Sequence, residues 1–141
     1  MKICLHDKLF KYTFEKGIKK RYIILIFMKE LGIINRGIEK VISEQGHKDL
    51  LMVCDAGFSI PYGIEVVDVS LGENKPMVVE ILNELKKYFS VEKLIMAKET
   101  KQISPTLFRS ISNVWGESME VEVVDHDELK QMSKDIKAVI R

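Results

Sequence analysis

The sequence predicts an α/β protein, a three-layer α/β/α sandwich around a mostly parallel sheet in a single domain. Apolar runs of strand length, such as residues 50–54, are continuous, as in parallel strands covered on both faces. They alternate with stretches whose apolar residues recur at helical spacing, such as 76–89. A chain of 141 residues with 46% hydrophobic content is also long enough to bury one core.

Capping residues and helix-breaking residues set the expected boundaries of these elements. Asn35 is a typical N-cap and Gly46 suits the left-handed position after a helix, which predicts a helix at 36–45. Pro76 and Ser104-Pro105 are typical of helix starts, and Gly116 of a helix end. The complete prediction in chain order is helix 36–45, strands 50–54 and 64–71, helix 76–89, strand 94–97, a helix from Pro105 to Gly116, strand 119–124, helix 127–134 and strand 136–140.

Residues 1–27 differ from the rest of the chain. They are rich in lysine and aromatic residues and show no steady hydrophobic period. We interpret them as an extension, either an artefact of a start codon assigned upstream of Met28 or a flexible basic arm. The predicted α/β domain is then 28–141.

Composition narrows the class of partner. The 22 basic and 21 acidic residues leave a net charge of +1, which favours neither nucleic acid nor an anionic membrane. The apolar run at 22–28 is far shorter than the roughly 20 residues that a membrane helix needs. Cys4 and Cys54 form no CxxC pair, which favours a reducing cytoplasm. We therefore expect a cytoplasmic protein with a small, uncharged partner.

Three polar residues stand at the ends of predicted elements, each with a catalytic and a purely structural interpretation. Asp55 follows strand 50–54, where ligands of parallel sheets collect, but it could simply form a turn. His47 follows a helix C-terminus, whose dipole favours a protonated imidazole, but it could simply cap carbonyls. His126 lies in VVDHDELK, where Asp125 is a typical N-cap, so it could simply mark a helix start.

The usual cofactor signatures are missing from the sequence. It has no HxH, HExxH or CxxC spacing for a metal, and neither GxGxxG nor GxxxxGK[ST] for a nucleotide. Cys54 lies within an apolar strand, where burial would raise the pKa of its thiol and make it a poor nucleophile. The type of catalysis that these residues favour is acid–base chemistry without a metal or cofactor, because imidazoles exchange protons near neutral pH.

Two long segments resemble the RbsD/FucU sugar mutarotase family. They are LGIINRGIEKVISEQGHKDLLMVCDAGFSIPYGIEVVDVSL and VVDHDELKQMSKDIKAVIR, and the resemblance spans 28–141. It implies interconversion of the pyranose and furanose forms of D-ribose without a cofactor, in a ring-shaped homo-oligomer, commonly a decamer. His47 would be the proton donor, Asp55 and His126 would bind the sugar, and Lys130 would line the same cavity. DAG is typical of the ribose branch, whereas the fucose branch has Asp-Ala-Asn.

One feature of the resemblance leaves alternatives open. Family members continue past the equivalent of Arg141 with a segment that closes the sugar pocket, which this sequence lacks. A non-catalytic sugar-binding or assembly subunit, a fucose mutarotase and a nucleotide-binding α/β domain therefore remain as alternatives.

The length of the strand between His47 and Asp55 separates these two residues within one chain. Residues 49–54 would span on the order of 20 Å as a strand, so His47 and Asp55 are expected to meet between neighbouring subunits rather than within one.

Overall fold

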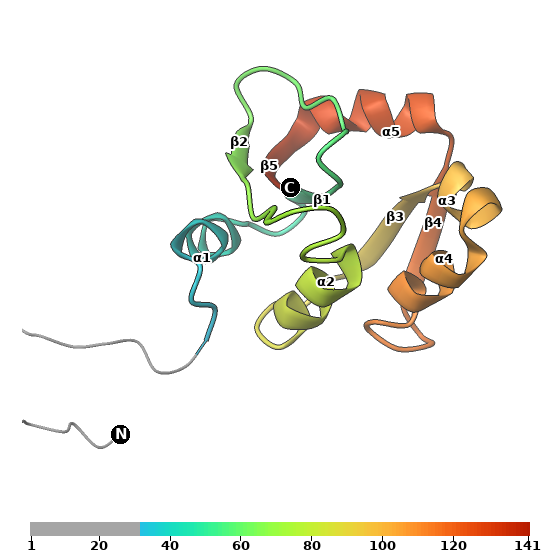
Figure 1. The fold of residues 1–141 in the computed structure, drawn as a ribbon, viewed down its shortest axis with the longest axis horizontal. Coiled ribbons are helices and arrows are strands. Elements are labelled where there is room, and N and C mark those ends of the chain that lie inside the picture. The colour runs from blue at the N-terminus through green and yellow to red at the C-terminus, as the bar shows by residue number, and fades with distance from the viewer. Residues whose placement is uncertain (1–31) are drawn as a thin grey trace, which may run out of the picture.

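The computed structural model describes residues 32–141, so the proposed extension at 1–27 lies outside the described residues. This part of the chain alternates strands with helices, as the sequence predicts (Figure 1). The helices are α1 (Arg36–Ser43), α2 (Val78–Lys86), α3 (Lys98–Ile103), α4 (Pro105–Ser112), α5 (His126–Met132) and the 3-10 helix η1 (Ser133–Asp135). The strands are β1 (Leu50–Val53), β2 (Glu65–Val67), β3 (Lys93–Ala97), β4 (Glu120–Val124) and β5 (Ile136–Ile140).

The strands form two sheets, and every pairing between them is parallel. The first sheet has the order β1-β5-β2, and the second pairs β3 with β4. The α/β class and the parallel pairing are therefore confirmed, although the hydrogen bonds are divided between two sheets rather than continuous through one. Helix α5 runs along the upper side in Figure 1 and links the end of β4 to the start of β5.

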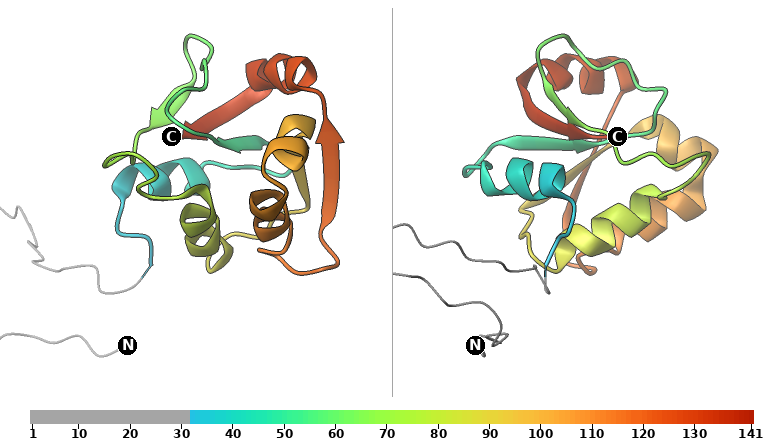
Figure 2. Two further views of the ribbon diagram at one scale, coloured as in Figure 1. Left: turned by 45° about the vertical axis from the view of Figure 1, so that its right-hand side comes forward. Right: turned by 60° about the vertical axis from the view of Figure 1, so that its left-hand side comes forward.

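The main core lies between the sheets and helices α1, α2 and α4. Its central residues include Val41 on α1, Leu85 on α2, and Ala138 and Ile140 on β5. Figure 2 shows α2 and α4 beside each other on this side of the molecule, and the two helices are in contact. Val139 points to the opposite face of β5 and is also buried, so both faces of this strand are covered. Buried strands of this kind explain the continuous apolar runs in the sequence.

Local signals placed several boundaries correctly. The side chain of Asn35 accepts a hydrogen bond from the backbone N–H of Ile38 at 3.0 Å, so the predicted N-cap of α1 is confirmed. Pro105 is the first residue of α4, and Gly116 has a φ of 101° after that helix has ended. The predicted strand at 136–140 coincides with β5.

Other predicted boundaries were wrong. The left-handed residue after α1 is Lys48, with a φ of 74°, and not Gly46. Strand β2 is only three residues long, because the side chain of Asp68 accepts a hydrogen bond from the backbone N–H of Ser70 and turns the chain. Helix α2 starts after Pro76, which precedes the N-cap rather than opening the helix. Helix α3 was not predicted, because none of its residues is buried and its sequence shows no apolar period.

Candidate functional site

His47 lies in a tight turn between α1 and β1. The backbone N–H of Gly46 donates to Oδ2 of Asp49 at 2.7 Å, and the backbone N–H of Asp49 donates to the carbonyl of Gly46 at 3.1 Å. These two hydrogen bonds close the turn at residues 46–49 around His47. Because the turn lies on the surface, the imidazole is 70% exposed and open to a partner from outside the chain.

Glu92 is the partner of this imidazole. Nδ1 of His47 lies 2.9 Å from Oε1 of Glu92, which comes from the loop before β3. This pair engages Nδ1 and leaves Nε2 without a partner among the described residues. The sequence analysis missed Glu92, because 45 residues separate it from His47 and no motif connects them.

Asp55 follows the carboxyl end of β1, as predicted. Its Oδ1 accepts a hydrogen bond from the backbone N–H of Gly57 at 2.7 Å, which is the local turn of the structural interpretation. Asp55 is exposed, and Oδ2 has no hydrogen-bond partner within residues 32–141. The turn therefore uses one carboxylate oxygen and leaves the second one for a ligand.

His126 is the first residue of α5, with Asp125 as the N-cap that the sequence predicts. The imidazole of His126 is exposed and makes no hydrogen bond or ion pair with any described residue. The side chain of Asp125 does not cap the helix, and its Oδ1 lies 3.6 Å from Nζ of Lys98. His126 is therefore placed by the start of the helix, while its side chain stays open to a ligand.

A cleft of about 460 Å³ separates the loop that follows Asp55 from helix α5. This volume lies within the roughly 300–1,000 Å³ of small-molecule sites. Ser59 and Pro61 line it from the loop, and Asp127, Lys130, Gln131, Ser133 and Lys134 from α5 and η1. Lys130 therefore lines a cleft, but Asp55 and His126 are not among the residues that line it, so a shared sugar cavity stays a prediction. The IP of the DAG-x-x-IP motif is the sequence signal for Pro61, whereas Ser59 carried none.

The three predicted site residues fall into two places. Asp55 follows the carboxyl end of β1, and His126 starts the helix that forms the other side of the cleft. His47 precedes the amino end of β1, so the whole strand separates it from Asp55. The structure therefore brings none of the three into direct contact within one chain, as expected for His47 and Asp55.

A second cleft of about 510 Å³ lies where β4 meets α3 and α5. Its polar lining mixes cationic and anionic groups, among them Lys98, Lys101, Asp125 and Glu128. Lys98 is already paired with Asp125, and Nζ of Lys101 lies 5.5 Å from the ring centre of Phe108. These cations already have partners within the protein, whereas Lys130 and Lys134 in the other cleft have no ion-pair partner within residues 32–141.

Cys54 and the acidic residues add no further chemistry to the site. Burial, together with the nearby charge of Asp55, raises the pKa of the Cys54 thiol to about 11, so the thiol is protonated at neutral pH. Within residues 32–141, no group of three or more His, Cys, Asp or Glu side chains is arranged to hold a metal ion. No helix in the same part of the chain has both the length and the hydrophobicity to cross a bilayer.

Comparisons with known proteins agree on one family. The family model described as the RbsD / FucU transport protein family matches residues 28–141. The D-ribose pyranase of Thermotoga maritima is 39% identical over 118 residues, which cover 81% of this chain and 87% of that protein. The D-ribose pyranase of Streptococcus agalactiae is 38% identical over 114 residues, covering 81% and 86%.

A solved structure supports the same assignment. Bacillus subtilis RbsD in complex with D-ribose superposes with a TM-score of 0.76 at 34% identity, and the match covers 81% of this chain and 86% of that one. Fold and sequence therefore agree over 81% of this chain. The chain belongs to the RbsD/FucU family.

Proposed function

We propose that this chain is a D-ribose pyranase, which interconverts the pyranose and furanose forms of D-ribose by opening and reclosing the ring. The named relatives and the ribose-bound neighbour support this activity. In the structure, the observation that carries it is the cleft between the loop that follows Asp55 and α5, lined by the side chains of Asp127, Lys130 and Lys134, which have no ion-pair partner within residues 32–141. We take 28–141 as the catalytic domain, which is the range that the family model matches.

The reaction needs one acid and one base. The anomeric hydroxyl loses a proton, the bond from the anomeric carbon to the ring oxygen breaks, and the ring oxygen gains a proton, which gives the free aldehyde. A different hydroxyl then adds to the aldehyde and closes the second ring, with the reverse proton movements. Both rings have the same atoms and oxidation state, so the balance requires neither a redox partner nor a second substrate.

We assign roles to the three residues from their surroundings. His47 donates the proton to the ring oxygen from Nε2, because Nδ1 faces Glu92. Asp55 binds a sugar hydroxyl through the carboxylate oxygen that the turn does not use. His126 holds or deprotonates the anomeric hydroxyl, and Lys130, one helical turn further along α5, lines the sugar cleft.

The proposed assembly is a homo-oligomer, with a decamer as the expected form. The positions of His47 and Asp55 before and after β1 support a site that two copies complete together. In such an arrangement, the exposed His47 turn of one copy meets the cleft of its neighbour. The free thiol of Cys54 is compatible with a reducing compartment, and we propose the cytoplasm.

Exchange NMR on D-ribose tests this function. We expect the wild-type protein to accelerate pyranose–furanose exchange and His47→Ala to lose about 10²- to 10⁴-fold of that rate, the usual contribution of a general acid. Lys87→Ala is the matched control, because Lys87 is an exposed residue at the C-cap of α2 whose ion-pair partner within residues 32–141 is Glu84, at 2.5 Å. It should keep the wild-type rate.

Three outcomes would contradict the proposal. No acceleration by the wild-type protein would leave a sugar-binding or assembly subunit as the better description. Faster exchange of L-fucose than of D-ribose would make the chain a fucose mutarotase. A thermal shift with nucleotides but not with pentoses would reject the whole class of sugar mutarotases.

A further inference from the structure

We propose that Lys137 and Asp49 are positioning residues that hold the turn at 46–49 in the conformation from which His47 works. This inference rests on the proposed function, because it concerns the same proton donor. Neither residue is near the sugar cleft, and both act through the backbone on which His47 is carried.

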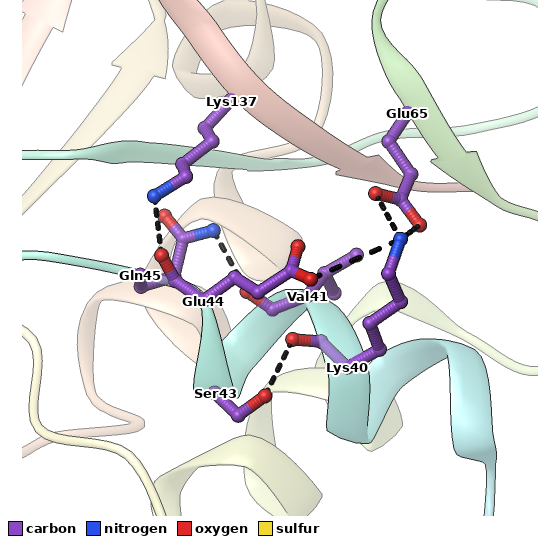
Figure 3. A network of polar contacts seen from close by, with 7 residues as sticks. All are labelled: Lys40, Val41, Ser43, Glu44, Gln45, Glu65 and Lys137. Carbon is purple, nitrogen blue, oxygen red and sulfur yellow. Dashed lines mark hydrogen bonds and ion pairs between the residues drawn. The ribbon is translucent and has the colours of Figure 1, made fainter.

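Lys137 connects strand β5 to the chain on both sides of His47, and Figure 3 shows its contact with Glu44. Its Nζ donates to the backbone carbonyl of Glu44, at the C-cap of α1, and to Oδ2 of Asp49 at 2.7 Å. The carbonyl lies three residues before His47 and the carboxylate two residues after it. One ammonium group therefore fixes the chain on both sides of the imidazole.

A break in the strand register explains why Lys137 can reach the turn. Leu50 of β1 is aligned with Ile136, whereas Leu51 is aligned with Ala138, so Lys137 stands as an extra residue between the two partners. Bulges of this kind redirect a side chain, and they are common beside functional sites. Lys137 is the exposed residue of a strand whose other four residues are buried. The bulge thus presents a cation at the edge where His47 lies.

Asp49 transmits this contact to the backbone. Its Oδ2 accepts hydrogen bonds from both Lys137 Nζ and the backbone N–H of Gly46. Lys137 and then this backbone N–H lower the pKa of Asp49, so the carboxylate stays charged well below neutral pH. Lys48, between His47 and Asp49, has a φ of 74°, a conformation that a side chain rarely adopts unless its surroundings impose it.

The imidazole has few restraints of its own. It is 70% exposed, and Glu92, which is 74% exposed, is its partner within residues 32–141. A single ion pair as exposed as this one holds geometry weakly, whereas the turn is held by two hydrogen bonds between Gly46 and Asp49 in addition to the contacts of Lys137. The direction of Nε2 therefore depends on the backbone of the turn, and a displacement of about 1 Å at a catalytic group can cost about 100-fold in rate.

The same network contains a matched control residue. Nζ of Lys40 lies 2.6 Å from Oε1 of Glu65 and 4.0 Å from Oε1 of Glu44, which ties α1 to β2 (Figure 3). Lys40 resembles Lys137 in exposure and in the type of contact, with side chains 55% and 45% exposed. It does not contact the turn at 46–49. Loss of Lys40 should therefore affect only the attachment of α1 to β2.

The experiment measures ribose exchange kinetics of the full chain with Lys137→Met, Lys137→Arg, Asp49→Asn and Lys40→Met. We expect kcat to fall about 10- to 100-fold in Lys137→Met, with KM within about twofold, because positioning and not sugar binding is lost. Asp49→Asn should lower kcat less, since its carbonyl oxygen still accepts from the backbone N–H of Gly46 while the charge that pairs with Lys137 is lost. Lys137→Arg should recover most of the rate, since it keeps a charged donor. Lys40→Met should stay within about twofold of wild type.

A second measurement separates this inference from the function itself. The imidazole ¹⁵N NMR signals of His47 should shift in Lys137→Met and Asp49→Asn and stay in place in Lys40→Met. If the wild-type protein shows no pyranase activity, these signals still show whether Lys137 and Asp49 determine the orientation of the His47 imidazole. Unchanged kcat and unchanged His47 signals in Lys137→Met would overturn the proposal. So would a failure of both substituted chains to fold, since the pair would then maintain the fold and not the turn.

Discussion

The two ends of strand β1 are built differently. At the amino end, the turn at 46–49 is closed by its own hydrogen bonds and tied to β5 through Lys137, and His47 is already paired. At the carboxyl end, Asp55 makes one local hydrogen bond and His126 has no partner among the described residues. The difference indicates that the proposed proton donor is fixed in advance, whereas the sugar-binding side is left open for its ligand.

The largest effect should come from mixing two inactive proteins. If His47 of one copy serves the cleft of another, co-assembly of His47→Ala with His126→Ala restores sites that contain both wild-type residues. Random assembly should restore about one quarter of the wild-type exchange rate, because each residue is intact in half of the copies. Exchange NMR on the co-expressed mixture measures this recovery. A mixture as inactive as its parents would mean that each copy supplies a complete site, contrary to the position of His47 across the strand from Asp55.

A tenfold effect is expected from the charge of Asp55. Asp55→Asn keeps a carbonyl oxygen that can accept from the backbone N–H of Gly57, so the turn survives while the charge is lost. We expect KM for ribose to rise about tenfold, since a charged hydrogen bond to the sugar becomes a neutral one. Asp55→Ala removes the turn as well and shows what the local structure contributes. If Asp55 only forms the turn, the Asn variant will match wild type and only the Ala variant will differ.

The smallest expected effect is a change in how protein stability depends on pH when Asp49, at the amino end of β1, loses its charge. The pKa of Asp49 is lowered in the folded protein by Lys137 and by the backbone N–H of Gly46. Its stabilising contribution is therefore complete above the unfolded pKa of about 3.9 and is lost as pH falls through the lower folded value. The difference in Tm between wild type and Asp49→Asn should be a few degrees at most near pH 6 and should shrink below pH 4. A difference that grows on acidification would show that Lys137 does not stabilise the charged form.

Local signals in the sequence predicted much of the fold. The cap at Asn35, the proline at the start of α4 and the apolar strand at 136–140 are confirmed, because each depends on neighbouring residues. Helix α3 could not be found in this way, since its side chains are not buried. The division of the strands between two sheets could not be predicted from the sequence either, because it depends on pairing between distant segments.

The contacts around the candidate site residues could not be predicted from the sequence, and the roles of these residues stay predictions. The sequence identified His47, Asp55 and His126 by their positions at the ends of elements, and in the structure His126 starts α5, which lines one side of the cleft. The pairing of His47 with Glu92 and the contact of Lys137 with Asp49 span 45 and 88 residues. Contacts over such separations are decided by the tertiary fold, so only the structure reveals them.

The position of β5 has a consequence for how the domain is made. This strand is the last of the five to leave the ribosome, yet it lies between β1 and β2, which do not pair with each other. Both earlier strands therefore wait with unsatisfied edges while most of the domain is synthesised, and the first sheet closes only when β5 inserts between them. The first sheet can therefore form only after β5 has been synthesised, and chains that stop before β5 present two open edges that chaperones or other nascent chains can bind.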